Sequence, residues 1–125
     1  MRRIACREYG DPETLTLDTD APVPEPGTGE VAIDVAAAGL NYADTLMVAG
    51  SYQATPGLPF APGLEVAGTV RALGDGVTGL ELGQRVLAIL DAGGFAEVAV
   101  APAGDVFPIP DAMDMATAAG FPITY

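Results

Sequence analysis

The sequence contains no histidine, tryptophan or lysine among its 125 residues, and Cys6 is its only cysteine. A zinc site built from cysteine and histidine therefore has no ligand set within these residues, and no disulfide can form between two of them. A serine or cysteine nucleophile also lacks the imidazole that usually activates it. These absences exclude triad-type hydrolysis by this chain, and Cys6 is interpreted as a small core residue in the first predicted strand.

Positive charge is scarce as well: the sequence has five arginines and 17 acidic residues, which gives a net charge of −12. Such a chain repels nucleic acid and anionic membranes, so we expect neither as a partner. The sequence has no apolar run of 18 residues, and Met1-Arg2-Arg3 leads into a strand rather than into the apolar segment of a signal peptide. We therefore expect a soluble, cytoplasmic protein.

Glycine and proline are abundant, at 16 and 11 residues, while half of the residues are apolar. This composition favours many turns and short strands over long helices. Alternating or continuous apolar segments predict strands at 1–8, 15–18, 30–38, 64–73, 85–90, 95–100 and around 106–107, with a hairpin-like connection at 91–94. Helical spacing predicts short helices at 42–49 and 115–119. The fold expected is mainly β, a small and partly open β-barrel with one or two short helices.

Residues 38–65 organise the predicted chemistry. A buried strand ends at Ala38, a helix opens at Asn41, and a second apolar strand begins near Glu65. If the two strands pair, Asn41, Tyr52 and the Leu64-Glu65 pair approach one cleft. No glycine-rich phosphate loop joins a strand to a helix here, so nucleotide-binding machinery must lie elsewhere.

Each polar candidate in this stretch has two interpretations. Asn41 can cap the helix or bind a ligand carboxamide or carbonyl through its own amide. Tyr52 can donate to a carbonyl oxygen on which charge develops, or be an ordinary loop aromatic. Asp44 is most simply a first-turn acid, and Tyr42 a packing residue. Glu65 needs a partner or a site, because an unpaired buried carboxylate is costly.

The pattern resembles the medium-chain dehydrogenase/reductases, and most closely their zinc-independent quinone oxidoreductase branch, the zeta-crystallin-like reductases. The resemblance covers nearly the whole chain and rests on Gly39-Leu40-Asn41-Tyr42-Ala43-Asp44-Thr45-Leu46-Met47, Gly50-Ser51-Tyr52, Leu58-Pro59-Phe60-Ala61-Pro62-Gly63-Leu64-Glu65-Val66-Ala67-Gly68, Gly93-Gly94-Phe95-Ala96-Glu97 and Ala118-Ala119-Gly120-Phe121-Pro122. It implies that residues 1–120 are a GroES-like, substrate-side domain. Residues 121–125, which stop abruptly in apolar sequence, would begin the junction to a Rossmann domain absent from this chain.

The resemblance also implies a reaction and a site. In zinc-dependent relatives a cysteine ligand matches Asn41 and a histidine ligand matches Leu64, so a metal-free enzyme is expected here. It would transfer a hydride from NADPH to a quinone or an α,β-unsaturated carbonyl, as a homodimer when full-length. Asn41 and Tyr52 would be catalytic, and Asn41, Tyr42 and Thr124 would contact the cofactor. The substrate would be bound by Tyr52, Leu64 and Glu65.

Two other functions stay open at the level of the sequence. An enoyl-thioester reductase of the same superfamily would use the same kind of cleft, and no residue here separates it from a quinone reductase. A non-catalytic GroES-like module could instead bind partners or serve a structural role. The chain also departs from the family at Gly83-Gln84-Arg85-Val86, where Gly-Asp-Arg-Val is usual, which puts the turn or ion pair there in question. By itself this chain is expected to bind NADPH weakly and to turn over nothing.

Overall fold

The computed structural model describes residues 1–52 and 56–124 of the chain. Its strands are β1 (Arg3–Ala5), β2 (Thr16–Asp18), β3 (Glu30–Ala38), β4 (Glu65–Leu73), β5 (Arg85–Ile89), β6 (Val98–Pro102) and β7 (Val106–Pro108). Its helices are α1 (Tyr42–Val48), α2 (Met115–Ala119) and α3 (Phe121–Thr124), with 3-10 turns at Pro12–Thr14 and Ala103–Asp105. No helix in the described ranges is long and apolar enough to cross a membrane.

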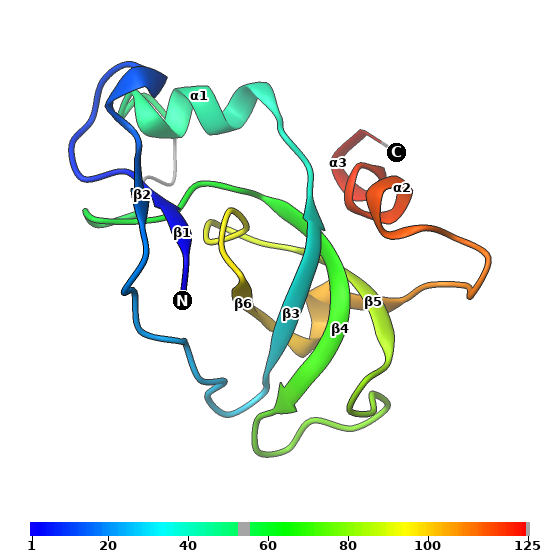
Figure 1. Cartoon of the computed structure of the whole chain (residues 1–125). Helices are drawn as coiled ribbons and strands as arrows, with labels where there is room; N and C mark the ends of the chain where they lie inside the picture. Colours follow the sequence, from blue (N-terminus) through cyan, green and yellow to red (C-terminus); the bar gives the residue numbers. More distant parts are fainter. Residues whose placement is uncertain (53–55, 125) are drawn as a thin grey trace.

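An antiparallel sheet of five strands in the order β6-β3-β4-β5-β7 forms the body of the fold, and β1 pairs separately with β2. The two long strands, β3 and β4, bend together through the middle of the molecule (Figure 1). Their register shifts twice, next to Ala32 and Val35. Gly68 lets the backbones of β3 and β4 come close together, because a Cβ atom there would collide with the carbonyl oxygen of Asp34. A glycine inside a strand is typical of such a close approach between two backbones.

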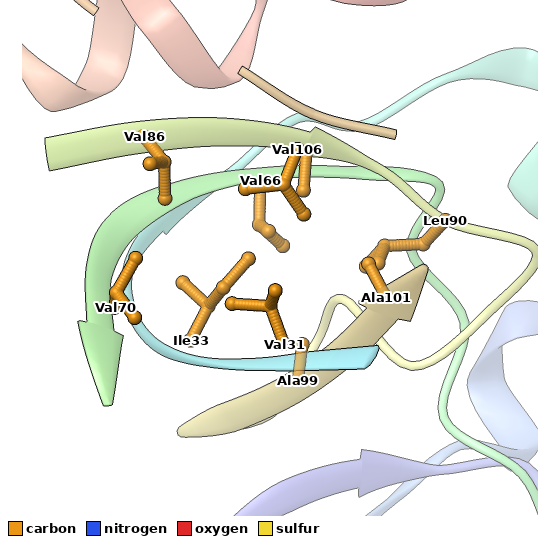
Figure 2. Packing of buried hydrophobic residues seen from close by; sticks show 10 residues of the cluster. Val31, Ile33, Val66, Val70, Val86, Leu90, Ala99, Ala101 and Val106 are labelled. Carbon is orange, nitrogen blue, oxygen red and sulfur yellow. The ribbon is translucent and has the colours of Figure 1, made fainter. Parts of the chain in front are cut away.

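The main apolar core fills the hollow of this curled sheet. Figure 2 shows side chains from β3, β4, β5 and β6 pointing towards one another, with Val106 of β7 closing the cluster. The alternation predicted for β3 accounts for its contribution, since Val31 and Ile33 face inward and are fully buried. The mainly β, partly open barrel predicted from the sequence is confirmed.

The hairpin-like connection predicted between β5 and β6 is wrong. β5 pairs with β4 and β7, whereas β6 crosses to pair with β3. The linking residues bond instead to the segment that precedes β4, with Gly93 N–H donating to the Ala61 carbonyl at 2.7 Å and Phe95 N–H to the Pro62 carbonyl at 2.9 Å. The backbone bonds expected within a hairpin are thus made to a distant loop.

Residues 83–86 still form a turn, although Gln84 stands where the family usually has aspartate. The Gln84 side-chain oxygen accepts the N–H of Glu81 at 3.0 Å, closing the turn as a carboxylate would. Arg85 donates to the backbone carbonyls of Pro110 and Asp111, at 2.9 and 3.2 Å, and to that of Met113. The guanidinium therefore holds the loop that leads into α2.

The helices lie around one end of the sheet. α2 packs on the outer face of β4 and β5, where Ala118 and Ala119 join a small cluster with Ala67 and Leu87. The chain rises from β3 into the start of α1, and α3 lies beside the same end of the sheet (Figure 1). α3 was not predicted, because Pro122 and the short length of the segment give no helical period. Its placement brings the last described residues to the predicted site.

Candidate functional site

The start of α1 is fixed by a capping arrangement between Asn41 and Asp44. Asn41 is the N-cap, and the Asp44 carboxylate accepts its backbone N–H at 2.8 Å. The reciprocal contact, from the Asp44 N–H to the Asn41 side chain, falls short of a full hydrogen bond. The second oxygen of Asp44 accepts the N–H of Gly63 at 3.0 Å, so this 2 % exposed acid also ties α1 to the start of β4. Asp44 is confirmed as a first-turn acid.

Glu65, the first residue of β4, joins three elements. Its side chain is 2 % exposed, and one carboxylate oxygen accepts the Nδ2 amide of Asn41 at 3.0 Å. The other oxygen accepts the backbone N–H of Ile123 in α3, also at 3.0 Å. The partner expected for this buried carboxylate is thus supplied by a side-chain amide and a backbone N–H rather than by an arginine.

Gly39 creates the space in which the Glu65 carboxylate lies. A Cβ atom at Gly39 would collide with Oε1 of Glu65 and come within 2.6 Å of its Cγ and Cδ atoms. The Gly39 N–H meanwhile donates to the Glu65 backbone carbonyl at 3.1 Å. The residue before the loop into α1 therefore has to be glycine for this carboxylate to reach Asn41.

Tyr52 and Leu64 lie in a second apolar cluster. Leu64 is 6 % exposed and packs with Cys6, Met47, Val48 and Phe60, and the half-buried Tyr52 packs against this cluster. The residues expected in one cleft are thus divided between two groups. Asn41 meets Glu65, while Tyr52 meets the cluster that contains the neighbouring Leu64.

The surface around the Asn41–Glu65 pair is apolar and exposed. Tyr42 and Leu40, on either side of Asn41, are 78 % and 76 % exposed, and Ile123 is exposed beside the carboxylate that its N–H contacts. Tyr42 is thus no packing residue within this chain. Thr124 belongs to α3, next to Ile123. The polar network is ringed by side chains that this chain leaves uncovered.

The ionisable groups of the described residues do not form a metal site. No group of three or more histidine, cysteine, aspartate or glutamate residues in the described ranges could hold a metal ion. Cys6 is fully buried, as predicted, and burial raises the pKa of its thiol. Its thiol donates to the Glu8 carbonyl.

Two of the surface hollows lie away from the residues predicted to form the site. One, of about 460 Å³, opens between the N-terminal segment and β6 and is lined by residues such as Arg3, Phe60 and Val98. Another, of about 360 Å³, lies between β5, β7 and α3 and is lined by residues such as Leu87, Phe107 and Phe121. Neither lining includes a residue of the Asn41–Glu65 network or Tyr52.

The roles of two members of this network, Gly39 and the Ile123 N–H, were not predicted from the sequence. Gly39 stood in the motif, but only the fold shows that its missing side chain accommodates Glu65. The Ile123 N–H is a backbone group 58 residues from its acceptor, and no residue type signals such a contact. A buried carboxylate without a basic neighbour in the sequence was the available signal, since it requires donors from somewhere.

Comparisons with known proteins agree with this architecture. The alcohol dehydrogenase GroES-like domain family matches residues 27–111. Quinone oxidoreductase from Rattus norvegicus is 38 % identical over 126 aligned residues, which cover all of this chain and 38 % of the rat protein. This chain thus spans less than half the length of that relative.

Solved structures show the same fold. The human synaptic vesicle membrane protein VAT-1 homolog-like protein has a TM-score of 0.93 and 41 % identity over 98 % of this chain and 40 % of that chain. Escherichia coli quinone oxidoreductase, solved in complex with NADPH, has a TM-score of 0.88 and 31 % identity over 95 % of this chain and 36 % of that chain. The chain therefore belongs to the alcohol dehydrogenase GroES-like domain family, and it is similar to quinone oxidoreductases and VAT-1-like proteins, in agreement with the resemblance to the zeta-crystallin-like branch.

Proposed function

We propose that this chain is the substrate-side domain of a zinc-independent, NADPH-dependent reductase of quinones or α,β-unsaturated carbonyls. Residues 1–120 would form that domain, and residues 121–125 would lead into a Rossmann domain that binds most of the cofactor. The full-length protein would be a cytoplasmic homodimer that acts on a small molecule.

The proposal rests on one observation above all. At the two positions where zinc-dependent relatives are expected to carry cysteine and histidine ligands, this chain has Asn41, bonded to Glu65, and Leu64, packed among apolar side chains. Neither supplies a thiolate or an imidazole, the donors that zinc prefers. A carboxamide held by a carboxylate takes the place of a metal site, and this supports a reaction that needs no metal.

The residues present suit the nicotinamide end of NADPH. That group is a flat ring bearing a carboxamide, and it needs apolar contacts on its faces and a few polar groups at its edge. The exposed Tyr42 and Leu40 flank the half-buried Asn41. The hydrogen bond from the Ile123 N–H to Glu65 holds α3, which includes Thr124, next to this group. We propose that Asn41, Tyr42 and Thr124 contact the cofactor here. When bound, NADPH supplies the hydride.

The protein's own part is to orient the acceptor and to manage a proton. We propose that Tyr52 donates its phenolic hydrogen towards the acceptor oxygen as negative charge develops there. Leu64 and the cluster around it would keep water away from that oxygen. Reduction of a quinone to a hydroquinone consumes one hydride and one proton overall, and we propose that both are delivered at this site.

The test compares acceptors and variants in the full-length protein that carries this chain. We expect NADPH oxidation with 1,4-benzoquinone, and Tyr52→Phe should lower kcat by about 10²-fold, the contribution typical of a positioned proton donor. Tyr9→Phe is the matched control, because the Tyr9 hydroxyl donates to the Pro56 carbonyl on an exposed loop. Asn41→Ala should lower the rate as well.

Other outcomes would redirect the assignment. Turnover of a crotonyl thioester but of no quinone would favour an enoyl-thioester reductase. A folded full-length protein that binds no nucleotide would refute the reductase and favour the non-catalytic module. Equal rates for Tyr52→Phe and Tyr9→Phe would remove the proposed role of Tyr52.

A further inference from the structure

The Glu65 carboxylate is saturated by groups of the protein itself. One oxygen accepts from Asn41 and the other from Ile123, both at 3.0 Å, and the side chain is nearly inaccessible to solvent. No ion pair to Glu65 occurs within the described residues. A carboxylate in this position has little capacity left for a ligand, which argues against direct substrate binding by Glu65.

We propose that Glu65 is a positioning residue that fixes the orientation of the Asn41 carboxamide; the inference rests on the proposed function of Asn41. A carboxamide has a donor end and an acceptor end of nearly equal size, and either can point in a given direction. A carboxylate only accepts, so Asn41 has to turn its Nδ2 towards Glu65. Its Oδ1 is then directed the other way, towards the first turn of α1.

This orientation decides what Asn41 offers to a bound molecule. With Nδ2 held by Glu65, the end of the carboxamide left for a bound molecule is the Oδ1 acceptor, which also makes the capping contact with the Asp44 N–H. The complementary ligand group is therefore an N–H or O–H donor, such as the amide of a carboxamide or the hydroxyl of a reduced acceptor. A reversed Asn41 would present a second donor to that group, and two donors facing each other forfeit the hydrogen bond and leave both unsatisfied.

Glu65→Gln distinguishes orientation from mere burial. The glutamine oxygen can still accept the Ile123 N–H, which turns its own NH₂ towards Asn41. Asn41 then relieves the clash between two NH₂ groups by reversing, so that its Oδ1 faces residue 65. The side chain of residue 65 keeps its hydrogen bonds, but the Asn41 NH₂ now faces the Asp44 N–H, so the capping contact is lost and the end of the carboxamide left for a ligand becomes a donor.

The double variant Asn41→Asp with Glu65→Gln restores the original polarity. The new glutamine NH₂ donates to one aspartate oxygen, its carbonyl accepts from Ile123, and the second aspartate oxygen faces the first turn of α1 as Asn41 Oδ1 does. Asn41→Asp alone places two carboxylates against each other and should be the most damaged of the three. Glu97→Gln is the control, because Glu97 is an exposed acid that pairs with Arg2 away from this network.

Two readouts test the proposal in the full-length protein. The first is kcat and KM for NADPH-dependent reduction of 1,4-benzoquinone. The second is solvent exchange of the Asn41 side-chain NH₂ by ¹⁵N NMR, assigned by its loss in Asn41→Asp; Asn41 is the only asparagine in this chain. We expect Glu65→Gln to lower kcat about tenfold and to speed exchange of the Asn41 NH₂, with Glu97→Gln unchanged in both. The double variant should return to within about threefold of the unaltered kcat.

The contrary results are equally definite. Unaltered kcat and unaltered NH₂ exchange in Glu65→Gln would overturn the positioning role, as would a double variant no more active than the product of the two single effects. If the unaltered protein reduces no quinone, the proposed function fails, and the exchange rates alone decide whether Glu65 orients Asn41.

Discussion

Replacing Gly39 with alanine should disrupt the network at its most crowded point. The added methyl group would collide with Oε1 of Glu65 and lie within 2.6 Å of its Cγ and Cδ atoms. A long exposed side chain could move aside, but Glu65 is buried and held at both oxygens. It can leave only by giving up its bonds to Asn41 and Ile123.

The cost follows from those two bonds. Hydrogen bonds to a charged group contribute about 1.5–3 kcal/mol each, and overpacking a tight site costs about 1–3 kcal/mol. Because the surrounding residues can relax in part, the measured cost should be smaller than the sum of these contributions. We therefore expect Gly39→Ala to lower the free energy of unfolding by about 3 kcal/mol. For a domain of this size that corresponds to a fall in Tm of about 10–20 °C.

The assay is urea unfolding of this chain followed by far-ultraviolet circular dichroism. Gly104→Ala is the matched control, because a Cβ atom there would meet nothing within 4 Å. It should change stability by no more than about 0.5 kcal/mol. Equal unfolding midpoints for the two variants would refute the view that Gly39 makes room for the carboxylate.

Three further predictions concern the scaffold. Arg85→Lys loses the planar fork that binds the carbonyls ahead of α2 and should cost about 1.5–3 kcal/mol in urea unfolding, whereas Arg71→Lys, at an exposed ion pair, should cost less than about 1 kcal/mol; equal costs would contradict this. Cys6 is buried with a raised thiol pKa, so a thiol reagent should label it only after unfolding, and rapid labelling of the native chain would disprove its core placement. The backbone N–H of Thr117 donates to the Asp114 carboxylate and is the main cause that lowers its pKa below 3.8. The stability that this cap contributes is therefore present above pH 3.8 and is lost as the pH falls through the pKa of the folded state. Asp114→Asn should flatten that part of the acid unfolding curve, and an unchanged curve would count against the cap.

The sequence predicted the parts of the fold that depend on local pattern. Alternation located β3, a continuous apolar run located β4, and Asn41 with Asp44 marked the start of α1. These signals arise from residues within a few positions of one another, where periodicity and capping chemistry act directly.

Long-range backbone pairing could not be predicted in the same way. The segment after β5 looked like a hairpin because Gly93-Gly94 suits a turn, yet its backbone N–H groups bond to residues 61–63. For the site, the burial of Glu65 was foreseeable from its apolar strand, but its Ile123 partner was not, since every residue except proline carries the same N–H. Side-chain identity thus located the site, and tertiary packing supplied its partners.

The central claim is that a carboxamide–carboxylate pair serves where zinc-dependent relatives bind a metal. The most direct measurement is NADPH oxidation with 1,4-benzoquinone by the full-length protein, with the zinc content of the same sample determined and Asn41→Ala run beside it. The account predicts turnover with far less than one zinc per chain and a large loss of rate in Asn41→Ala. Activity that rises in proportion to added zinc, or that is untouched by Asn41→Ala, would contradict it.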